Sequence, residues 1–368
     1  MTLCVKDEGD ILDAQLAFHL NAGVDFVIAT DTGSTDDTVE ILERYQRAGR
    51  LDLRHDHSQP FRLGEQRTKM ARAAATDYGA DWVINSDADE FWWPRGFDLQ
   101  TVLDALPSRY GVVFGLWRPF VPRPDDGSPF YERMTERLAP AHPINDPTSK
   151  FRPNTKLAHR ADPNVTVGRG NHTFVDTFHL PLRGWYPLEV FHFPFRSQDQ
   201  VAVKSVKSDT HAGPKRGGYL RRFASEADAE TGDDAFRRLA VDDATLEEGL
   251  ASGIVVKDVR LRDSLRSLVD PQSGRFAPAA DGPGLRLPLP SLVDDARFAA
   301  DVAVLGEANL IRTQRRLYDV ERRVRAVERN PAIRLTRGLR PLVRNRLVRP
   351  NRRRSVVRVS VWRGRTRR

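Results

Sequence analysis

The chain has 368 residues, which is long enough to bury one large hydrophobic core or two modest ones. Its single cysteine, Cys4, excludes an internal disulfide framework and fits a reducing compartment, and no apolar run approaches the roughly 18 residues that a membrane-spanning helix needs. Acidic and polar residues already occur from Lys6 to Asp10, so we expect no signal peptide and a soluble, cytoplasmic protein.

The net charge of +8 is concentrated in the last part of the sequence. Residues 331–368 contain 14 arginines, no lysine and no acidic residue, so the rest of the chain carries a net charge of −6. A mildly acidic body argues against a nucleic-acid-binding core. The Arg-rich tail predicts either attachment to the anionic inner face of the membrane, where each arginine contributes about 1 kcal/mol, or a solvated, disordered segment.

Strand and helix patterns alternate over the first 120 residues. Apolar, β-branched runs predict strands at 3–5, 26–29, 51–53 and 81–85. Helical spacing, capping residues and terminal glycines predict helices at 11–20, at 34–49 and at 65–78. This alternation is typical of an α/β protein with a mainly parallel sheet flanked by helices, in which ligands bind beyond the carboxyl ends of the strands.

The later segments are less regular. Residues 118–190 are rich in Pro, Gly, Asn, His and aromatics, which indicates long functional loops. Residues 201–330 are predicted to be mostly helical, and Leu310, Leu317 and Val324 recur every seven residues. This spacing fits either a short coiled coil or a helix packed on its own domain. We therefore expect a catalytic domain at 1–200, a helical extension at 201–330 and a basic tail at 331–368.

Two aspartates follow the fourth predicted strand. Asp87 and Asp89 are separated by one residue, so their side chains point to the same side of an extended backbone. Paired carboxylates at a strand end suit a hard divalent cation that bridges to phosphate oxygens, although aspartate is also common in turns. Asp31 ends the second predicted strand, and the three carboxylates should converge at one edge of the sheet.

Three motifs in this order resemble those of the family 2 glycosyltransferases. They are Lys6-Asp7-Glu8 after the first strand, the run Asp31-Thr32-Gly33-Ser34-Thr35-Asp36-Asp37-Thr38 after the second, and Asp87-Ala88-Asp89 after the fourth. The branch that the chain is most similar to carries a Lys-Asn-Glu signature after its first strand, so Asp7 departs from it. The resemblance covers about residues 1–200. It implies a GT-A fold, a nucleotide-sugar donor, a Mg²⁺ or Mn²⁺ ion and, usually, inversion at the anomeric carbon.

The resemblance also implies roles for single residues. Glu8 would shape the nucleotide pocket, and Asp31 would hydrogen-bond the nucleobase. Asp87 would lie near the ribose and the metal, while Asp89 would ligate the metal. A late histidine often completes the metal shell in related enzymes, and His192 in an aromatic strand is the candidate for this role.

Further candidates complete the expected site. His172 is the alternative metal ligand, or a residue that contacts the acceptor. Arg67 and Arg196 are candidates for binding the diphosphate, although Arg67 also fits a solvated helix face. Trp92 and Trp93 offer flat surfaces for stacking on an acceptor sugar, or they pack in the core.

Inverting transfer needs a carboxylate that takes the proton of the acceptor hydroxyl. Asp176 is the preferred candidate among the acidic residues between the Asp pair and His192, namely Asp125, Asp126, Glu132, Glu136, Asp146, Asp162, Asp176 and Glu189. The sequence thus predicts a glycosyltransferase acting on a glycan, lipid-linked or other hydroxyl acceptor. The alternative is a catalytically inactive GT-A scaffold that recruits partners at the membrane. A nucleotidyltransferase is disfavoured because no Gly-rich phosphate loop follows the first strand.

Overall fold

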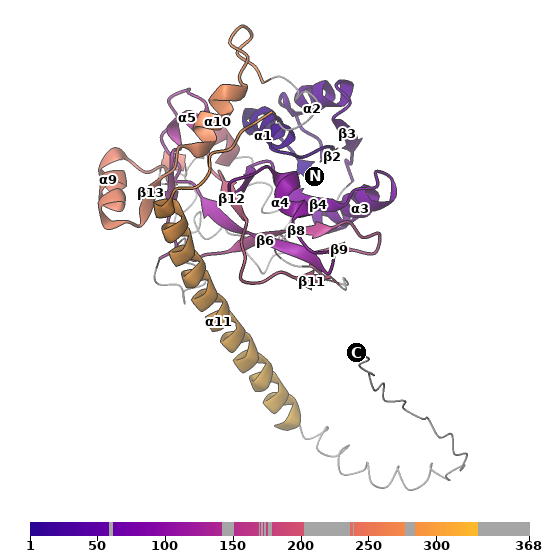
Figure 1. Cartoon of the computed structure of the whole chain (residues 1–368), viewed down its shortest axis with the longest axis vertical. Helices are drawn as coiled ribbons and strands as arrows, with labels where there is room; N and C mark the ends of the chain where they lie inside the picture. The colour runs from indigo at the N-terminus through magenta and orange to yellow at the C-terminus, as the bar shows by residue number, and fades with distance from the viewer. Residues whose placement is uncertain are drawn as a thin grey trace, which may run out of the picture. The chain divides into compact units, whose positions relative to one another are not determined.

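The computed structural model describes residues 1–58, 62–141, 151–168, 170, 172, 174–175, 179–201, 236–237, 239–276 and 284–329 (Figure 1). The chain divides into two units, Met1–Asn309 and Leu310–Arg368. The large sheet and all the candidate site residues that are described belong to the first unit. Among the described residues, no helix is both long enough and apolar enough to cross a membrane.

The first half of the sheet is parallel. Strands and helices alternate as β1 (Thr2–Val5), α1 (Gly9–Asn21), β2 (Val27–Asp31), α2 (Thr38–Arg47), β3 (Leu51–His55), α3 (Leu63–Thr76) and β4 (Trp82–Ser86). The strands lie in the order β3-β2-β1-β4, with Val5 opposite Asp31 and Leu3 opposite Ser86. This arrangement confirms the predicted α/β class and brings the segments that follow β1, β2 and β4 to one edge of the sheet.

The second half of the sheet is mixed. It continues from β4 through β8 (Thr155–Arg160), β6 (Tyr110–Pro119), β12 (Leu188–His192) and β5 (Glu90–Pro94), and β11 (Leu180–Pro181) pairs with β6. β8 is antiparallel to both of its neighbours, β6 and β12 are parallel, and β5 is antiparallel to β12. His192 therefore ends a strand of the same sheet, beside the edge strand β5 that follows the acidic motif.

Helices cover both faces of the parallel half, because neighbouring residues of a strand point to opposite sides. In β2, Val27 and Ala29 belong to the main core, which includes apolar side chains of α1 and α2. Ile28 between them belongs to a second cluster with residues of α3, among them Met70. The continuous apolar run in β2 is thus explained by burial on both faces.

The remaining described elements surround this sheet. They are α4 (Leu99–Asp104), α5 (Phe130–Arg133), β7 (Glu136–Leu138), β9 (Thr166–Val167), β10 (Phe174–Val175), α9 (Asp243–Ser252), β13 (Val255–Lys257), α10 (Arg260–Leu268) and α11 (Leu292–Arg329). α10 lies against α1 (Figure 1), and its Leu261 and Leu265 belong to the main core. The helical segment after residue 240 therefore contributes to the core of the first unit.

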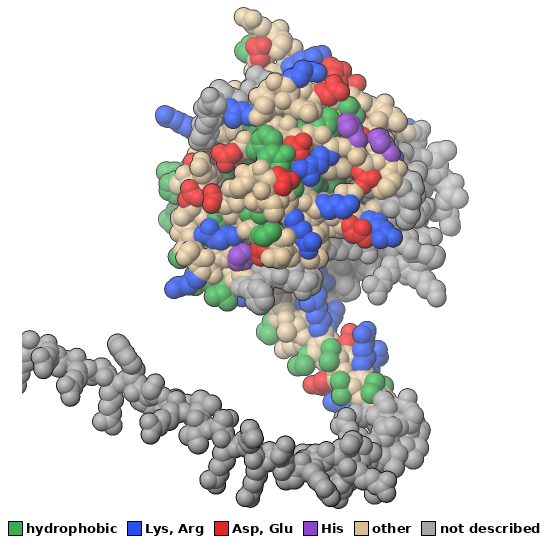
Figure 2. Space-filling model, turned by 90° about the vertical axis from the view of Figure 1, so that its right-hand side faces the viewer, with side chains coloured by type: hydrophobic (Ala, Val, Ile, Leu, Met, Phe, Trp, Pro, Cys, Tyr) green, Lys and Arg blue, Asp and Glu red, His purple; other side chains and the backbone are tan. Residues whose placement is uncertain are grey.

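Charged side chains of both signs are mixed on the surface. On the face drawn in Figure 2, Lys and Arg alternate with Asp and Glu over the first unit. The arginines of the predicted basic tail lie outside the described residues.

A buried ionic network ties the helical segment to the sheet. Glu189 of β12 is 1% exposed, and its carboxylate pairs with Arg118 at 2.6 Å, Arg260 at 2.9 Å and Arg95 at 3.1 Å. Arg118 also pairs with Asp301 of α11 at 2.5 Å. Burial alone raises the pKa of Glu189, but the arginines outweigh it and hold the pKa far below the usual value.

We expect Glu189→Gln to lower the free energy of unfolding by about 3 kcal/mol, because it leaves buried guanidinium groups without their shared carboxylate. Denaturant unfolding at neutral pH measures this loss. The matched control is Glu43→Gln, which removes an exposed ion pair with Arg47 and should change the free energy by less than about 0.5 kcal/mol. Equal effects of the two substitutions would contradict the role of the network.

Candidate active site

The loops after β1 and β2 are joined by short polar contacts. The Asp7 backbone N–H donates to Ser34 Oγ at 2.9 Å, and Thr35 N–H donates to Asp7 Oδ1 at 2.7 Å. The Glu8 N–H donates to Thr38 Oγ1 at 2.9 Å. Asp7 has a φ of +47°, a conformation that aspartate and asparagine tolerate better than most residues. The backbone conformation at this position is thus compatible with the aspartate found there.

Asp31 is held in one orientation at the end of β2. Its carboxylate accepts hydrogen bonds from Gly33 N–H at 3.0 Å, Ser34 N–H at 3.1 Å and Ser34 Oγ–H at 2.5 Å, and the side chain is only 2% exposed. Burial raises its pKa, but these hydrogen bonds more than compensate, and the net pKa is lowered. Asp31 is therefore a fixed anion at neutral pH.

Arg196 connects the chain after β12 to the loop after β1. Its guanidinium is fully buried and donates to Glu8 Oε2 and to both oxygens of Asp10, each at 2.7 Å. Burial lowers its pKa, but the two carboxylates more than offset this and raise it above the usual value. The predicted contact of Arg196 with a diphosphate is thus corrected, since the guanidinium orients Glu8 instead.

The acidic motif after β4 is neutralised from two sides. Asp87 pairs with Arg67 of α3 and with Lys156 Nζ of β8, the latter at 3.2 Å. Lys156 also pairs with Glu90 Oε1 at 2.7 Å. Burial raises the pKa of Asp87, but Arg67 and Lys156 together lower it by more, so the net pKa is below the usual value. Burial dominates for Glu90, so its pKa is raised. Arg67 is thus a buried partner of the motif and not part of a solvated helix face.

Asp89 and His192 face each other across the site. His192 Nε2 lies 3.6 Å from Asp89 Oδ2, and the imidazole packs on Trp117 with ring centroids 4.4 Å apart. The expected three-residue metal site of Asp87, Asp89 and His192 is not closed by Asp87. Within the described residues, the ligand atoms of these three side chains do not all lie within 4.8 Å of one another. A carboxylate oxygen and an imidazole nitrogen at this separation suit two ligands of one divalent cation.

His172 lies beside the acidic motif. Its Nδ1 is 2.7 Å from the carbonyl oxygen of Thr155, and Lys156 Nζ donates to the carbonyl oxygen of Gly170 at 2.8 Å. Burial and the charge of Lys156 lower the pKa of His172 to about 4, so the imidazole is neutral at pH 7. This places the alternative histidine next to the cation that holds Asp87.

Trp92 and Trp93 pack in the core. Both are essentially unexposed, and Trp93 stacks between Phe18 and Phe191 with ring centroids 5.8 and 5.3 Å away. Trp92 Nε1 donates to Ser86 Oγ at 3.1 Å, which fixes the residue before the acidic motif. The expectation that these rings stack on an acceptor sugar is therefore wrong for this structure, because β5 is buried on both faces.

Most described candidates for the general base have structural partners. Asp125 pairs with Arg133, and Glu132 pairs with Arg266. Asp126 accepts a hydrogen bond from Ser128 N–H, and Asp162 accepts one from Asn164 N–H. Glu136 and Glu189 are buried. Asp146 and the preferred Asp176 lie outside the described residues. The geometry therefore does not test Asp176.

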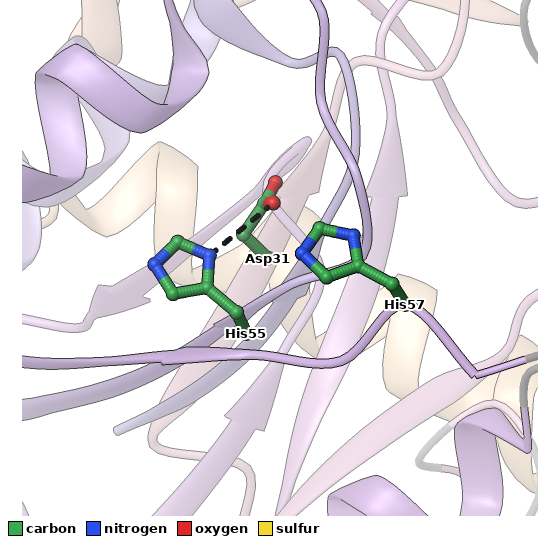
Figure 3. A group of neighbouring side chains, drawn as sticks. All are labelled: Asp31, His55 and His57. Carbon is green, nitrogen blue, oxygen red and sulfur yellow. Dashed lines mark ion pairs between the residues drawn. The ribbon is translucent and has the colours of Figure 1, made fainter.

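The sequence reasoning missed four residues at this edge of the sheet. Lys156 and Glu90 are buried beside the acidic motif, and the sequence around Lys156 in β8, Thr-Lys-Leu-Ala-His-Arg, gave little signal for this. His55 and His57 follow β3 beside Asp31 (Figure 3). Their separation by one residue at a strand end, like that of Asp87 and Asp89, was the signal for this pair.

Part of the chain matches a known protein family. Residues 11–175 match the sequence model of glycosyl transferase family 2. They form a glycosyl transferase family 2 domain. No curated protein matches the sequence. The matched range of the family 2 domain contains Asp31, Asp87 and Asp89, whereas Glu8 precedes it and His192 and Arg196 follow it.

Solved structures of S. aureus TarS give distant matches. The crystal structure of TarS 1–349 has 12% identity and a TM-score of 0.30, with 78% of this chain and 98% of that chain covered. The complex of TarS 1–349 with UDP-GlcNAc has 11% identity and a TM-score of 0.32, with 78% and 99% covered. These values are too low to add to the family assignment.

The lowered pKa of His172 predicts a pH-dependent stability. Between its unfolded value near 6.5 and its folded value of about 4, only the unfolded chain takes up this proton, so the free energy of unfolding falls as the pH is lowered. We expect His172→Asn to reduce the loss of stability between pH 7 and pH 4.5 by about 2 kcal/mol. Urea unfolding at both pH values measures it, and an unchanged difference would contradict the lowered pKa.

Proposed function

We propose that this domain is a metal-dependent, inverting glycosyltransferase that moves a sugar from a nucleotide-diphosphate sugar to a glycan or other hydroxyl acceptor. The observation that carries the proposal is that a fixed Asp31 carboxylate and the facing pair Asp89 and His192 lie at the ends of strands of one sheet, with Asp31 and Asp89 inside the range that matches family 2. β1 lies between β2 and β4, so the ends of the strands that precede Asp31's loop and the acidic motif are about 10 Å apart.

Asp31 supports a nucleobase site in this proposal. The nucleobase of the donor would donate a ring N–H to Asp31, whose position is fixed by Gly33 and Ser34. The adjoining loop is held by Asp7 and by the clamp of Arg196 on Glu8. Such prior ordering reduces the conformational entropy that is lost when a ligand binds.

Asp89 and His192 would hold a Mn²⁺ or Mg²⁺ ion, with the diphosphate supplying further oxygens. The imidazole ligand favours Mn²⁺, because Mg²⁺ prefers oxygen ligands. The ion would stabilise the charge that develops on the leaving diphosphate. Lys156 and Arg67 serve the site by neutralising Asp87 and Glu90, so that these carboxylates do not repel the diphosphate.

Two parts of the proposal lie outside the described residues. Asp176 would take the proton of the acceptor hydroxyl as it attacks the anomeric carbon on the face opposite the leaving diphosphate. The Arg-rich tail at 331–368 would hold the enzyme at the anionic inner face of the membrane, near a lipid-linked or growing glycan acceptor.

We expect Asp89→Asn to weaken Mn²⁺ binding at least tenfold, because it removes a charged ligand while keeping the size of the side chain. Electron paramagnetic resonance of free Mn²⁺ measures the binding. In a thermal-shift screen of nucleoside diphosphates and their sugars with Mn²⁺, the stabilisation of the wild-type protein by its donor should be lost in the variant.

The matched control is Asp126→Asn in an exposed loop, which should leave Mn²⁺ binding and the donor-dependent shift unchanged. If no nucleotide sugar stabilises the wild-type protein, or if Asp89→Asn binds Mn²⁺ as tightly as the wild type, the proposed metal-dependent transfer fails. Donor binding without any hydrolysis or transfer would instead favour the inactive scaffold.

A further inference from the structure

Asp31 has two histidine neighbours from the adjacent strand. His55 is the last residue of β3 and the register partner of Asp31, and His57 follows two residues later. The imidazole planes are within 7° of parallel, with ring centroids 6.1 Å apart. Figure 3 shows a ring nitrogen of each histidine directed toward the Asp31 carboxylate, and one ligand atom from each residue lies within 4.8 Å of the others.

We propose that Asp31, His55 and His57 bind a divalent transition-metal ion, with Zn²⁺ as the representative. Two imidazole nitrogens and one carboxylate oxygen are a ligand set that suits Zn²⁺ and is poorly suited to Mg²⁺, which prefers oxygen ligands. This site is separate from Asp89 and His192, and it is defined without reference to sugar transfer.

The geometry needs little rearrangement to close on an ion. His55 Nδ1 lies 3.7 Å from Asp31 Oδ2, whereas ligand atoms at about 2.0–2.1 Å from a tetrahedral zinc lie about 3.3 Å apart. His55 and His57 are both exposed, so their rings can shift without disturbing the core. The Asp31 carboxylate is already oriented by hydrogen bonds from Gly33 and Ser34, so it needs no reordering to bind an ion.

The glycine after Asp31 also favours this arrangement. A Cβ at Gly33 would lie 3.3 Å from His57 Nδ1, and Gly33 has a φ of +92°. A side chain at this position would therefore crowd the imidazole and strain the backbone. The loop that orients Asp31 thus leaves space for His57 next to the carboxylate.

If Asp31 also contacts the nucleobase, as the proposed function has it, zinc and the nucleotide compete for one carboxylate. Reciprocal linkage then requires that each weaken the binding of the other by the same factor. This second expectation rests on the proposed function, whereas zinc binding itself does not.

The test is isothermal titration of the full-length protein with Zn²⁺ in the absence of nucleotide. We expect a zinc site that is weakened at least tenfold by His55→Asn and by His57→Asn and that Asp89→Asn leaves intact. The control His179→Asn removes a histidine that also neighbours a carboxylate, Asp162 at 3.9 Å, and should have no effect. Zinc affinity unchanged in both histidine variants, or lost in Asp89→Asn, would overturn the proposal.

Repeating the titration with a saturating nucleoside diphosphate separates the two proposals. Weaker zinc binding in its presence supports a shared Asp31. Zinc binding that is lost in the histidine variants but indifferent to the bound nucleotide would confirm the zinc site and contradict the placement of the nucleobase at Asp31.

A second inference concerns α11 within the unit that begins at Leu310. Its apolar residues recur in a heptad pattern, and each is at least half exposed. They are Leu310 (57%), Leu317 (58%), Val320 (55%), Val324 (50%) and Val327 (54%). Leu317 and Val324 occupy position a of the heptad, and Val320 and Val327 occupy position d. Such a stripe on a helix is the seam of a coiled coil.

We infer that the occupant of this seam is α11 of a second copy of the chain, in parallel orientation. With Leu317 at position a, Arg316 is at g and Glu321 is at e, so a parallel pair places Arg316 opposite Glu321 of the other copy. An antiparallel pair would instead bring g positions together and e positions together, which sets the arginines (Arg316, Arg323) against arginine and the glutamates (Glu321, Glu328) against glutamate. Within one helix Glu321 pairs with Arg325 at 3.3 Å, an exposed contact that is worth little.

Sedimentation of the full-length protein over a range of concentrations tests the dimer. Arg316→Glu should weaken dimerisation about tenfold, and adding Glu321→Arg should restore it, which only a parallel pair explains. Arg322→Glu at the outward f position is the matched control. A monomer at all concentrations, or a double variant no better than Arg316→Glu, would overturn the parallel dimer.

Discussion

The candidate site depends on the buried ion pairs of Lys156. Glu90 is fully buried and Asp87, three residues before it, is about one-third exposed, so two carboxylates lie close together in a partly desolvated place, which is unfavourable without a cation between them. Lys156 reaches both, and Arg67 takes the other side of Asp87. These contacts join β4, β8 and α3 around the acidic motif, and they determine which carboxylate faces His192.

This constraint divides the roles within the Asp-x-Asp motif. Asp87 is used to hold the turn together, whereas Asp89 faces His192 at 3.6 Å. Arg196 has a similar role on the other side of the site, where its guanidinium donates hydrogen bonds to Glu8 and Asp10. Arg67 and Arg196, both expected to contact a diphosphate, therefore act by positioning other residues.

The periodic part of the structure could be predicted from the sequence, but the pairing of its charges could not. Alternating apolar runs and helix caps fix the strands around Val27 and Val83 and the helices between them, because burial on a sheet face has a local pattern. The partner of Asp87 is Lys156, 69 residues later, in a segment without regular spacing. Trp92 and Trp93 were ambiguous for the same reason, since burial on both faces of β5 depends on strands that come later in the chain.

The acidic motif and Asp31, the two parts of the candidate site, have different surroundings. The acidic motif is enclosed by oppositely charged side chains of the protein, so its charges are largely fixed by the fold. Asp31 is held by hydrogen bonds from its own loop, and its other neighbours, His55 and His57, are exposed. The groups beside a ligand at Asp31 are therefore exposed imidazoles and not buried cations. At the β2–β3 side of the site, a metal ion or a nucleotide can therefore change the binding of the other at Asp31 without disturbing the core.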